Sequence, residues 1–211
     1  MFSPREIKLW SALPTPLHDD LTVDEAAVER TVQASIEGGM NGVFLAGTCG
    51  EGPWLPDREK MRLIKTARKA AQGRLRIAAQ VSDNSVPRVQ DNIKRVADAG
   101  ADCGMMAAPS VFMNATPDRV VGLFRDSITK SSLPMGVYDL GPHCPVMIPE
   151  EHLREIYELP NVVMVKDSSG DAGRRAQALA ARQANPSLQL FNGDEFRCVE
   201  YLEAGYDGCM F

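Results

Sequence analysis

The residue whose type and position most favour covalent chemistry is Lys166, which directly follows the apolar run 162–165. Such a run is typical of a parallel strand that is buried on both faces. Burial disfavours the ammonium form of a lysine and lowers its pKa, and a neutral amine can attack a ketone to form an imine. The protonated imine is an electron sink for reactions at the adjacent carbon. The alternative is a strand-end lysine that reaches solvent or pairs with Asp167.

Two further segments could assist the lysine. Tyr138 lies near the end of the run 135–139, and its phenol could relay protons; an aromatic side chain that only packs there is equally consistent with the sequence. The turn 47–52 is rich in glycine, so its backbone N–H groups could converge on a carboxylate. The Thr48 hydroxyl could also bond Tyr138 and extend the relay. Alternatively, the glycines serve only to make a tight turn.

These residues need elements that bring them together, and the chain alternates short apolar runs with longer amphipathic segments. We expect strands at 9–13, 42–46, 75–81, 103–107, 135–139, 162–166, 188–191 and 207–211. We expect helices at 22–37, 56–71, 86–99, from 116 onward, and at 149–159, 171–184 and 195–204. The first helix is expected to begin at Thr22, with Glu25 completing a capping box.

Strand–helix alternation implies parallel pairing, which either an open doubly wound sheet or a closed (β/α)8 TIM barrel can provide. Eight units of about 25 to 35 residues favour the barrel, and no G-x-G-x-x-G follows the first strand, which weakens the dinucleotide-binding sheet. We therefore predict one barrel domain over residues 1–211. The carboxyl ends of barrel strands form one mouth, where four side chains should meet: Thr48, Tyr138, Lys166 and Asp194.

The chain ends at Phe211, inside the last expected strand. A barrel of this class usually has about 250 residues, and chain ends usually lie in exposed, loosely packed segments. We therefore expect a barrel that is truncated after its eighth strand, without the eighth helix and without a C-terminal helical extension. A seven-unit barrel with a terminal half-repeat is the alternative.

Composition restricts the class of ligand. The formal net charge is −5 with no basic run, which disfavours nucleic acid and anionic membranes and favours a small-molecule substrate.

Five widely spaced cysteines indicate reduced thiols in the cytoplasm, and the first six residues show no secretory signal. The spacing of the three histidines indicates no metal site. One of them, His143, follows Tyr138 on the expected mouth and is a candidate to meet the substrate.

Four short motifs, in this order along the chain, carry a resemblance to a known family. The turn 47–51 (GTCGE) resembles G-T/S-T-G-E, and Tyr138-Asp139 before Gly141-Pro142 resembles Y-N-x-P. The segment 165–171 (VKDSSGD) resembles a Schiff-base lysine segment, and residues 193–195 (GDE) resemble a G-D-D/E turn. From about Leu9 to Phe211 the chain resembles the dihydrodipicolinate synthase/N-acetylneuraminate lyase family of class I aldolase-type (β/α)8 barrels.

The resemblance implies residue roles and an assembly. Lys166 would form the imine with a 2-oxo acid, and Tyr138 would shuttle protons with help from Thr48. The substrate-binding residues would be Thr48, Cys49, His143, Gly193 and Asp194. The covalent imine would replace any cofactor. Family members are commonly tetramers with extra C-terminal helices, so we expect a homo-oligomer, a dimer or tetramer, for a full-length chain.

The sequence departs from the family's pattern at three places, and these departures narrow the range of expected reactions. Cys49 replaces a hydroxyl of the motif, and a thiol is the weaker hydrogen-bonding partner. The synthases of the family place a tyrosine pair where residues 109–112 (PSVF) contain no phenol. They also carry an arginine for the second substrate's carboxylate where His143 stands, and a neutral imidazole cannot replace a bidentate guanidinium.

We therefore predict an aldolase, dehydratase or related lyase that acts on pyruvate or a 2-oxo acid, such as a 2-keto-3-deoxy sugar acid or a 4-hydroxy-2-oxo acid. One alternative is a 4-hydroxy-tetrahydrodipicolinate synthase. A second is a non-catalytic relative that binds oxo acids, which Cys49 and Val111 would explain. A third is a chain that is inert because its barrel cannot close.

Overall fold

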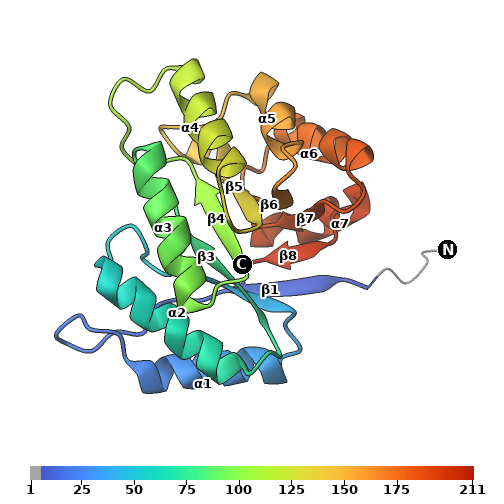
Figure 1. Cartoon of the computed structure of the whole chain (residues 1–211). Coiled ribbons are helices and arrows are strands. Elements are labelled where there is room, and N and C mark those ends of the chain that lie inside the picture. The colour runs from blue at the N-terminus through green and yellow to red at the C-terminus, as the bar shows by residue number, and fades with distance from the viewer. Residues whose placement is uncertain (1–5) are drawn as a thin grey trace.

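The computed structural model describes residues 6–211 and shows eight parallel strands closed into a barrel, with helices around the outside (Figure 1). The predicted (β/α)8 barrel is confirmed and the open sheet is excluded, because β8 pairs with β1. The alternative in which the barrel cannot close is therefore wrong. Residues 1–5, where no secretory signal was expected, lie outside the described residues. The strands are β1 (Lys8–Ala12), β2 (Gly42–Leu45), β3 (Arg76–Gln80), β4 (Cys103–Ala107), β5 (Met135–Asp139), β6 (Val162–Asp167), β7 (Gln189–Asn192) and β8 (Gly208–Met210).

Each of the first seven strands leads into a helix. The helices are α1 (Glu25–Glu37), α2 (Asp57–Ala71), α3 (Val86–Ala99), α4 (Pro117–Thr129), α5 (Glu150–Tyr157), α6 (Ala172–Ala184) and α7 (Cys198–Ala204), with short 3-10 helices η1 (Gly141–His143) and η2 (Glu195–Arg197). Within the described chain, only Phe211 follows β8. None of the helices in residues 6–211 has the length and hydropathy required to cross a membrane.

Two helices begin more than one residue away from the predicted start. The first helix begins at Glu25 because Asp24 caps it, with its carboxylate accepting a hydrogen bond from the Ala27 N–H at 2.9 Å; the predicted capping box at Thr22 is wrong. Aspartate is a preferred N-cap residue. The helix predicted at 195–204 is divided into η2 and α7, because Asp194 caps the 3-10 turn by accepting from the Phe196 N–H.

The buried side chains form two layers, one on each side of the barrel wall. The larger layer lies between the strands and the helices. The smaller one fills the barrel interior with Trp10, Phe44, Met105, Tyr138, Met164, Phe191, Met210 and smaller neighbours. Successive side chains of a strand point to opposite faces, so each strand contributes to both layers. Because the interior is filled, a ligand can reach the barrel only at a mouth.

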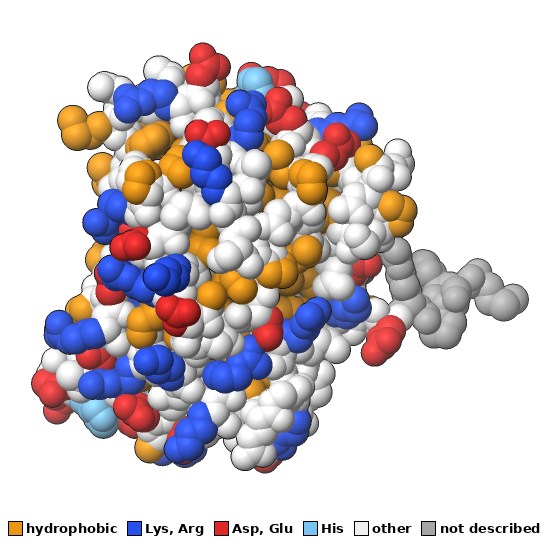
Figure 2. All heavy atoms as spheres, viewed as in Figure 1, with side chains coloured by type: hydrophobic (Ala, Val, Ile, Leu, Met, Phe, Trp, Pro, Cys, Tyr) orange, Lys and Arg blue, Asp and Glu red, His pale blue; other side chains and the backbone are white. Residues whose placement is uncertain are grey.

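The outer surface carries charges of both signs. On the face seen in Figure 2, Lys and Arg side chains lie among Asp and Glu side chains over α2 and α3. Several of these charges form ion pairs between helices, including Arg95 of α3 with Asp57 of α2.

Candidate active site

Lys166 lies at the carboxyl end of β6 with its side chain only 3% exposed. Its Nζ lies 4.5 Å from the centroid of the Tyr138 ring and 5.2 Å from that of the Phe44 ring. Burial lowers the pKa of Lys166 to about 8, and electrostatic interactions with Cys49 and Glu195 oppose this shift in part. A substantial fraction of the lysine is therefore the neutral amine near pH 8, which is the form that attacks a carbonyl.

Tyr138 stands beside Lys166 because the two residues are register partners on the adjacent strands β5 and β6. Burial raises the pKa of its phenol, whereas hydrogen bonds with the hydroxyls of Thr48 and Ser168 lower it in part. The structure thus brings Thr48 to Tyr138. Ser168 was not predicted as a site residue. Its spacing could have indicated it, because residues two apart along an extended chain share a face. Ser168 should therefore point toward the mouth, as Lys166 does.

The turn after β2 brings Thr48 and Cys49 to the mouth, where both side chains are exposed. Backbone hydrogen bonds close the turn, from the Gly52 N–H to the Gly47 carbonyl and from the Glu51 N–H to the Thr48 carbonyl, each at 3.1 Å. Two interactions show that Thr48 and Cys49 lie near the lysine. Thr48 forms a hydrogen bond with Tyr138, and Cys49 influences the pKa of Lys166.

The turn after β7 forms the other wall of the site, and it requires glycine at position 193. A Cβ atom on Gly193 would lie 2.7 Å from Cε of Lys166 and 2.1 Å from Oγ of Ser168. The Gly193 N–H donates to the Asp167 carbonyl at 2.7 Å, and the Ser168 hydroxyl donates to the Gly193 carbonyl at 3.0 Å. Gly193 therefore packs directly against the lysine.

The carboxylate of Asp194, also a predicted site residue, contacts η2. Its Oδ1 accepts the Phe196 N–H at 3.0 Å and its Oδ2 lies 3.5 Å from Nε of Arg197. The side chain thus holds η2 at the rim of the site.

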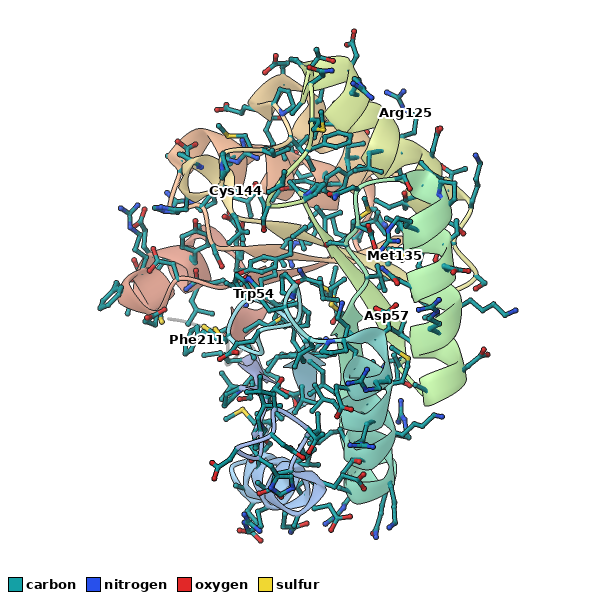
Figure 3. The ribbon with its side chains drawn as sticks, turned by 90° about the vertical axis from the view of Figure 1, so that its left-hand side faces the viewer. Trp54, Asp57, Arg125, Met135, Cys144 and Phe211 are labelled. Carbon is teal, nitrogen blue, oxygen red and sulfur yellow. The ribbon has the colours of Figure 1, made fainter. Side chains whose placement is uncertain are left out.

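A hollow of about 500 Å³ opens next to Gly193 and Ser168. It is lined by His143, Ser168, Ser169, Gly170, Gly193, Asp194, Glu195, Phe196 and Arg197. Figure 3 shows the mouth from the side: Trp54, Cys144 and Phe211, which follow β2, β5 and β8, lie opposite Met135 at the start of β5. The predicted residue His143, at the end of η1, lines the same hollow as Gly193 and Asp194.

The residues that follow Tyr138 and Lys166 point to the opposite side of the wall. Asp139 accepts two hydrogen bonds from Arg174, at 2.8 and 2.7 Å, and one from the Tyr157 hydroxyl at 3.1 Å. Asp167 accepts from the hydroxyls of Ser169 and Tyr206, and burial raises its pKa.

These contacts exclude an ion pair between Lys166 and Asp167, which was one alternative raised by the sequence. Asp167 lies on the outer side of β6, so it is not the partner of Lys166. The ion pair between Asp139 and Arg174 was not predicted, because the two residues are far apart in sequence and meet only in the folded barrel.

Comparison with known proteins agrees with this geometry. Residues 6–210 match the dihydrodipicolinate synthetase family. The 4-hydroxy-tetrahydrodipicolinate synthases of Acidiphilium cryptum and Stenotrophomonas maltophilia (strain K279a) are each 28% identical to this chain, over 94% and 96% of its length. The matches cover 67% of each relative, so the chain spans about two thirds of their length.

Solved structures show the same fold. The dihydrodipicolinate synthase of Thermotoga maritima gives a TM-score of 0.89 at 22% identity and covers 98% of this chain and 70% of that chain. The enzyme of Cyanidioschyzon merolae gives 0.88 at 25% identity, with the same coverage. The resemblance predicted from the four motifs is thus confirmed, and the chain belongs to the dihydrodipicolinate synthetase family.

Proposed function

We propose that the protein is a Schiff-base-forming lyase that acts on pyruvate or a related 2-oxo acid through Lys166. The observation that carries the proposal is the buried lysine itself, whose pKa is lowered to about 8 beside a hydrogen-bonded phenol. Family membership and the names of the relatives support the same class of reaction.

The proposed reaction uses the groups that lie at the mouth of the barrel. The N–H groups of Thr48 and Cys49 hold the substrate carboxylate, and the Lys166 amine attacks the keto carbon. Tyr138 supplies a proton to the departing hydroxyl, so that water leaves and an imine forms. The protonated imine then accepts the electron pair released when a bond at the adjacent carbon breaks, or supplies it when one forms. No metal or organic cofactor is needed, because the imine is the electron acceptor.

The proposal is tested by reduction of the imine. Incubation with pyruvate and borohydride should add a reduced pyruvyl group at Lys166, detected by intact mass and peptide mapping. The Lys166→Arg variant should give no adduct, and Lys65→Arg, a change of an exposed lysine on α2, should give the wild-type result. Absence of the adduct from a folded wild-type protein would refute the proposal.

A 4-hydroxy-tetrahydrodipicolinate synthase is the second candidate, because the relatives bear that name. His143 and the segment 109–112 count against it, since the resemblance predicts an arginine and a tyrosine pair there. A non-catalytic oxo-acid-binding protein is the third. Binding without turnover across a panel of 2-keto-3-deoxy sugar acids and 4-hydroxy-2-oxo acids would favour the third candidate.

We also infer a homo-oligomeric protein, a dimer or tetramer when full length, that resides in the cytoplasm. The family resemblance supports the assembly, and five cysteines that form no disulfide support the location. Sedimentation velocity of the full-length protein tests the assembly, and a monomer at micromolar concentration would contradict it.

A further inference from the structure

Two of the cysteines are in contact although they belong to different elements. Cys198 is the first residue of α7, and Cys209 lies on β8. The Cys209 thiol forms a hydrogen bond with the Cys198 sulfur, and burial together with the charge and the hydrogen bond of Cys198 raises the pKa of Cys209 to about 11. The fold therefore brings together two thiols that can be joined by a covalent bond.

The register of the last two strands explains this contact. Met210 faces the barrel interior, so its neighbour Cys209 faces the outer side, as does the register partner Asn192 on β7. The Asn192 amide donates to the Asp194 carbonyl at 2.6 Å, and the same carbonyl lies 4.0 Å from Sγ of Cys198. The first residue of α7 thus lies over the outer face of β8.

The two thiols differ in their access to solvent. Cys198 is half-buried, whereas Cys209 is only 4% exposed. An oxidant reaches the more accessible of two thiols first. The other three cysteines lie on separate elements: Cys49 in the turn after β2, Cys103 on β4 in the barrel interior, and Cys144 directly after η1. Cys198 is therefore placed to be oxidised first, with Cys209 beside it as the second thiol.

We propose that Cys198 and Cys209 are a modification site, at which hydrogen peroxide oxidises the two thiols to a disulfide between α7 and β8. The Cys198 sulfur first attacks one peroxide oxygen, the O–O bond breaks, and a sulfenic acid and water form. The Cys209 sulfur then attacks the Cys198 sulfur, the S–O bond breaks, and hydroxide leaves as water with the Cys209 proton. The two sulfur atoms lose two electrons, which the peroxide gains.

The disulfide needs only a small movement of the side chains. Two thiols in hydrogen-bond contact must approach to about 2.05 Å, and rotation of the half-buried Cys198 side chain supplies the approach. The Cys198 thiol then ceases to donate to the Glu195 carbonyl, which lies 3.0 Å away in η2. In a reducing compartment a thiol reductant reverses the bond, as is usual for disulfides of cytosolic proteins.

The bond would secure the strand that closes the barrel. β8 pairs with β1 and with β7, and the disulfide would close the loop 198–209 and so restrict the unfolded chain. We expect the midpoint of thermal unfolding to rise by roughly 3 to 10 °C on oxidation. Dithiothreitol should return the midpoint to its original value.

Peptide mapping after hydrogen peroxide treatment and alkylation tests the site. A protease that cleaves after glutamate cuts at Glu200 and Glu203 and so separates the two cysteines. The peptides that contain Cys198 and Cys209 should be linked, and dithiothreitol should separate them. The control variant Cys144→Ser should give the same link, whereas Cys198→Ser should give none.

Three results would overturn the proposal: alkylation of both thiols after treatment, a sulfinic acid at Cys198 beside an alkylated Cys209, or a link from either residue to another cysteine. A linked protein that unfolds at the same temperature as the reduced protein, or at a lower one, would refute the stabilisation of β8. Circular dichroism establishes that Cys198→Ser is folded, and Cys209→Ala takes its place if it is not.

Discussion

The amine of Lys166 titrates within the pH range in which an enzyme works. Burial against two aromatic rings and a packed barrel interior lowers its pKa to about 8. An ordinary lysine, with a pKa of about 10.4, is almost entirely protonated at neutral pH. The difference increases the fraction of nucleophilic amine at pH 7 by roughly two orders of magnitude.

This shift predicts the pH dependence of imine formation. The ammonium form dominates below pH 8, so the rate of pyruvate trapping should rise about tenfold from pH 6 to pH 7 and level off above pH 8 to 9. Borohydride trapping rates from pH 6 to pH 10 measure the profile. A rate that continues to rise tenfold per pH unit up to pH 10 would show that the lysine is not desolvated.

At the scale of the elements, the ion pair between Asp139 and Arg174 joins β5 to α6. Both side chains are buried, and Arg174 also donates to the Ile148 carbonyl at 2.9 Å in the segment before α5. The Gly141 N–H donates to Asp139 as well, at 2.9 Å. The pair therefore fixes both ends of the loop that carries His143 to the mouth.

Removal of one partner should be costly. Arg174→Met leaves the Asp139 carboxylate buried without its cation, and we expect the free energy of unfolding to fall by about 3 to 5 kcal/mol. Arg154 is exposed on α5 and pairs with Glu158 at 2.6 Å, so Arg154→Met should change it by about 1 kcal/mol or less. Urea unfolding measures both variants. If the double variant Asp139→Leu, Arg174→Met loses as much stability as the sum of the single changes, the two residues are not coupled.

At the scale of the whole molecule, the barrel depends on contact between its first and last strands. Gly208 of β8 is the register partner of Lys8 of β1. A Cβ atom on Gly208 would lie 1.7 Å from the Lys8 carbonyl oxygen, which is a backbone atom and cannot rotate aside. Closure therefore needs glycine at this position.

A pair of glycine substitutions tests closure. Gly208→Ala should separate β1 from β8 and lower the free energy of unfolding by about 3 kcal/mol or more, as in other overpacked sites. Gly122, inside α4, has no atom within 4 Å of its Cβ position, so Gly122→Ala should raise stability by about 0.5 to 1 kcal/mol. Thermal unfolding of both variants compares them. Equal stability of Gly208→Ala and the wild type would show that the strand contact is dispensable.

Much of this architecture could be predicted from the sequence. The bounds of α3, β4 and β5 agree residue for residue, because glycine and proline residues lie near the boundaries and the apolar periodicity is clear. The sequence could not decide whether Thr22 or Asp24 caps α1, since threonine and aspartate are both preferred N-cap residues. The contacts of Asp139 and Ser168 depend on partners far away in sequence, which periodicity cannot identify.

The alternating direction of side chains in β5 and β6 has a consequence for the way such a protein can vary. In both strands a mouth-facing residue is followed at once by a buried acid that contacts the helical layer, as in Tyr138-Asp139 and Lys166-Asp167. Insertion of a single residue into β6 before Lys166 would reverse the directions of Lys166 and Asp167. The Lys166 amine would then point toward Tyr206 and the Asp167 carboxylate toward the mouth. Natural or engineered insertions and deletions should therefore be confined to the loops, while the length and register of these two strands stay fixed.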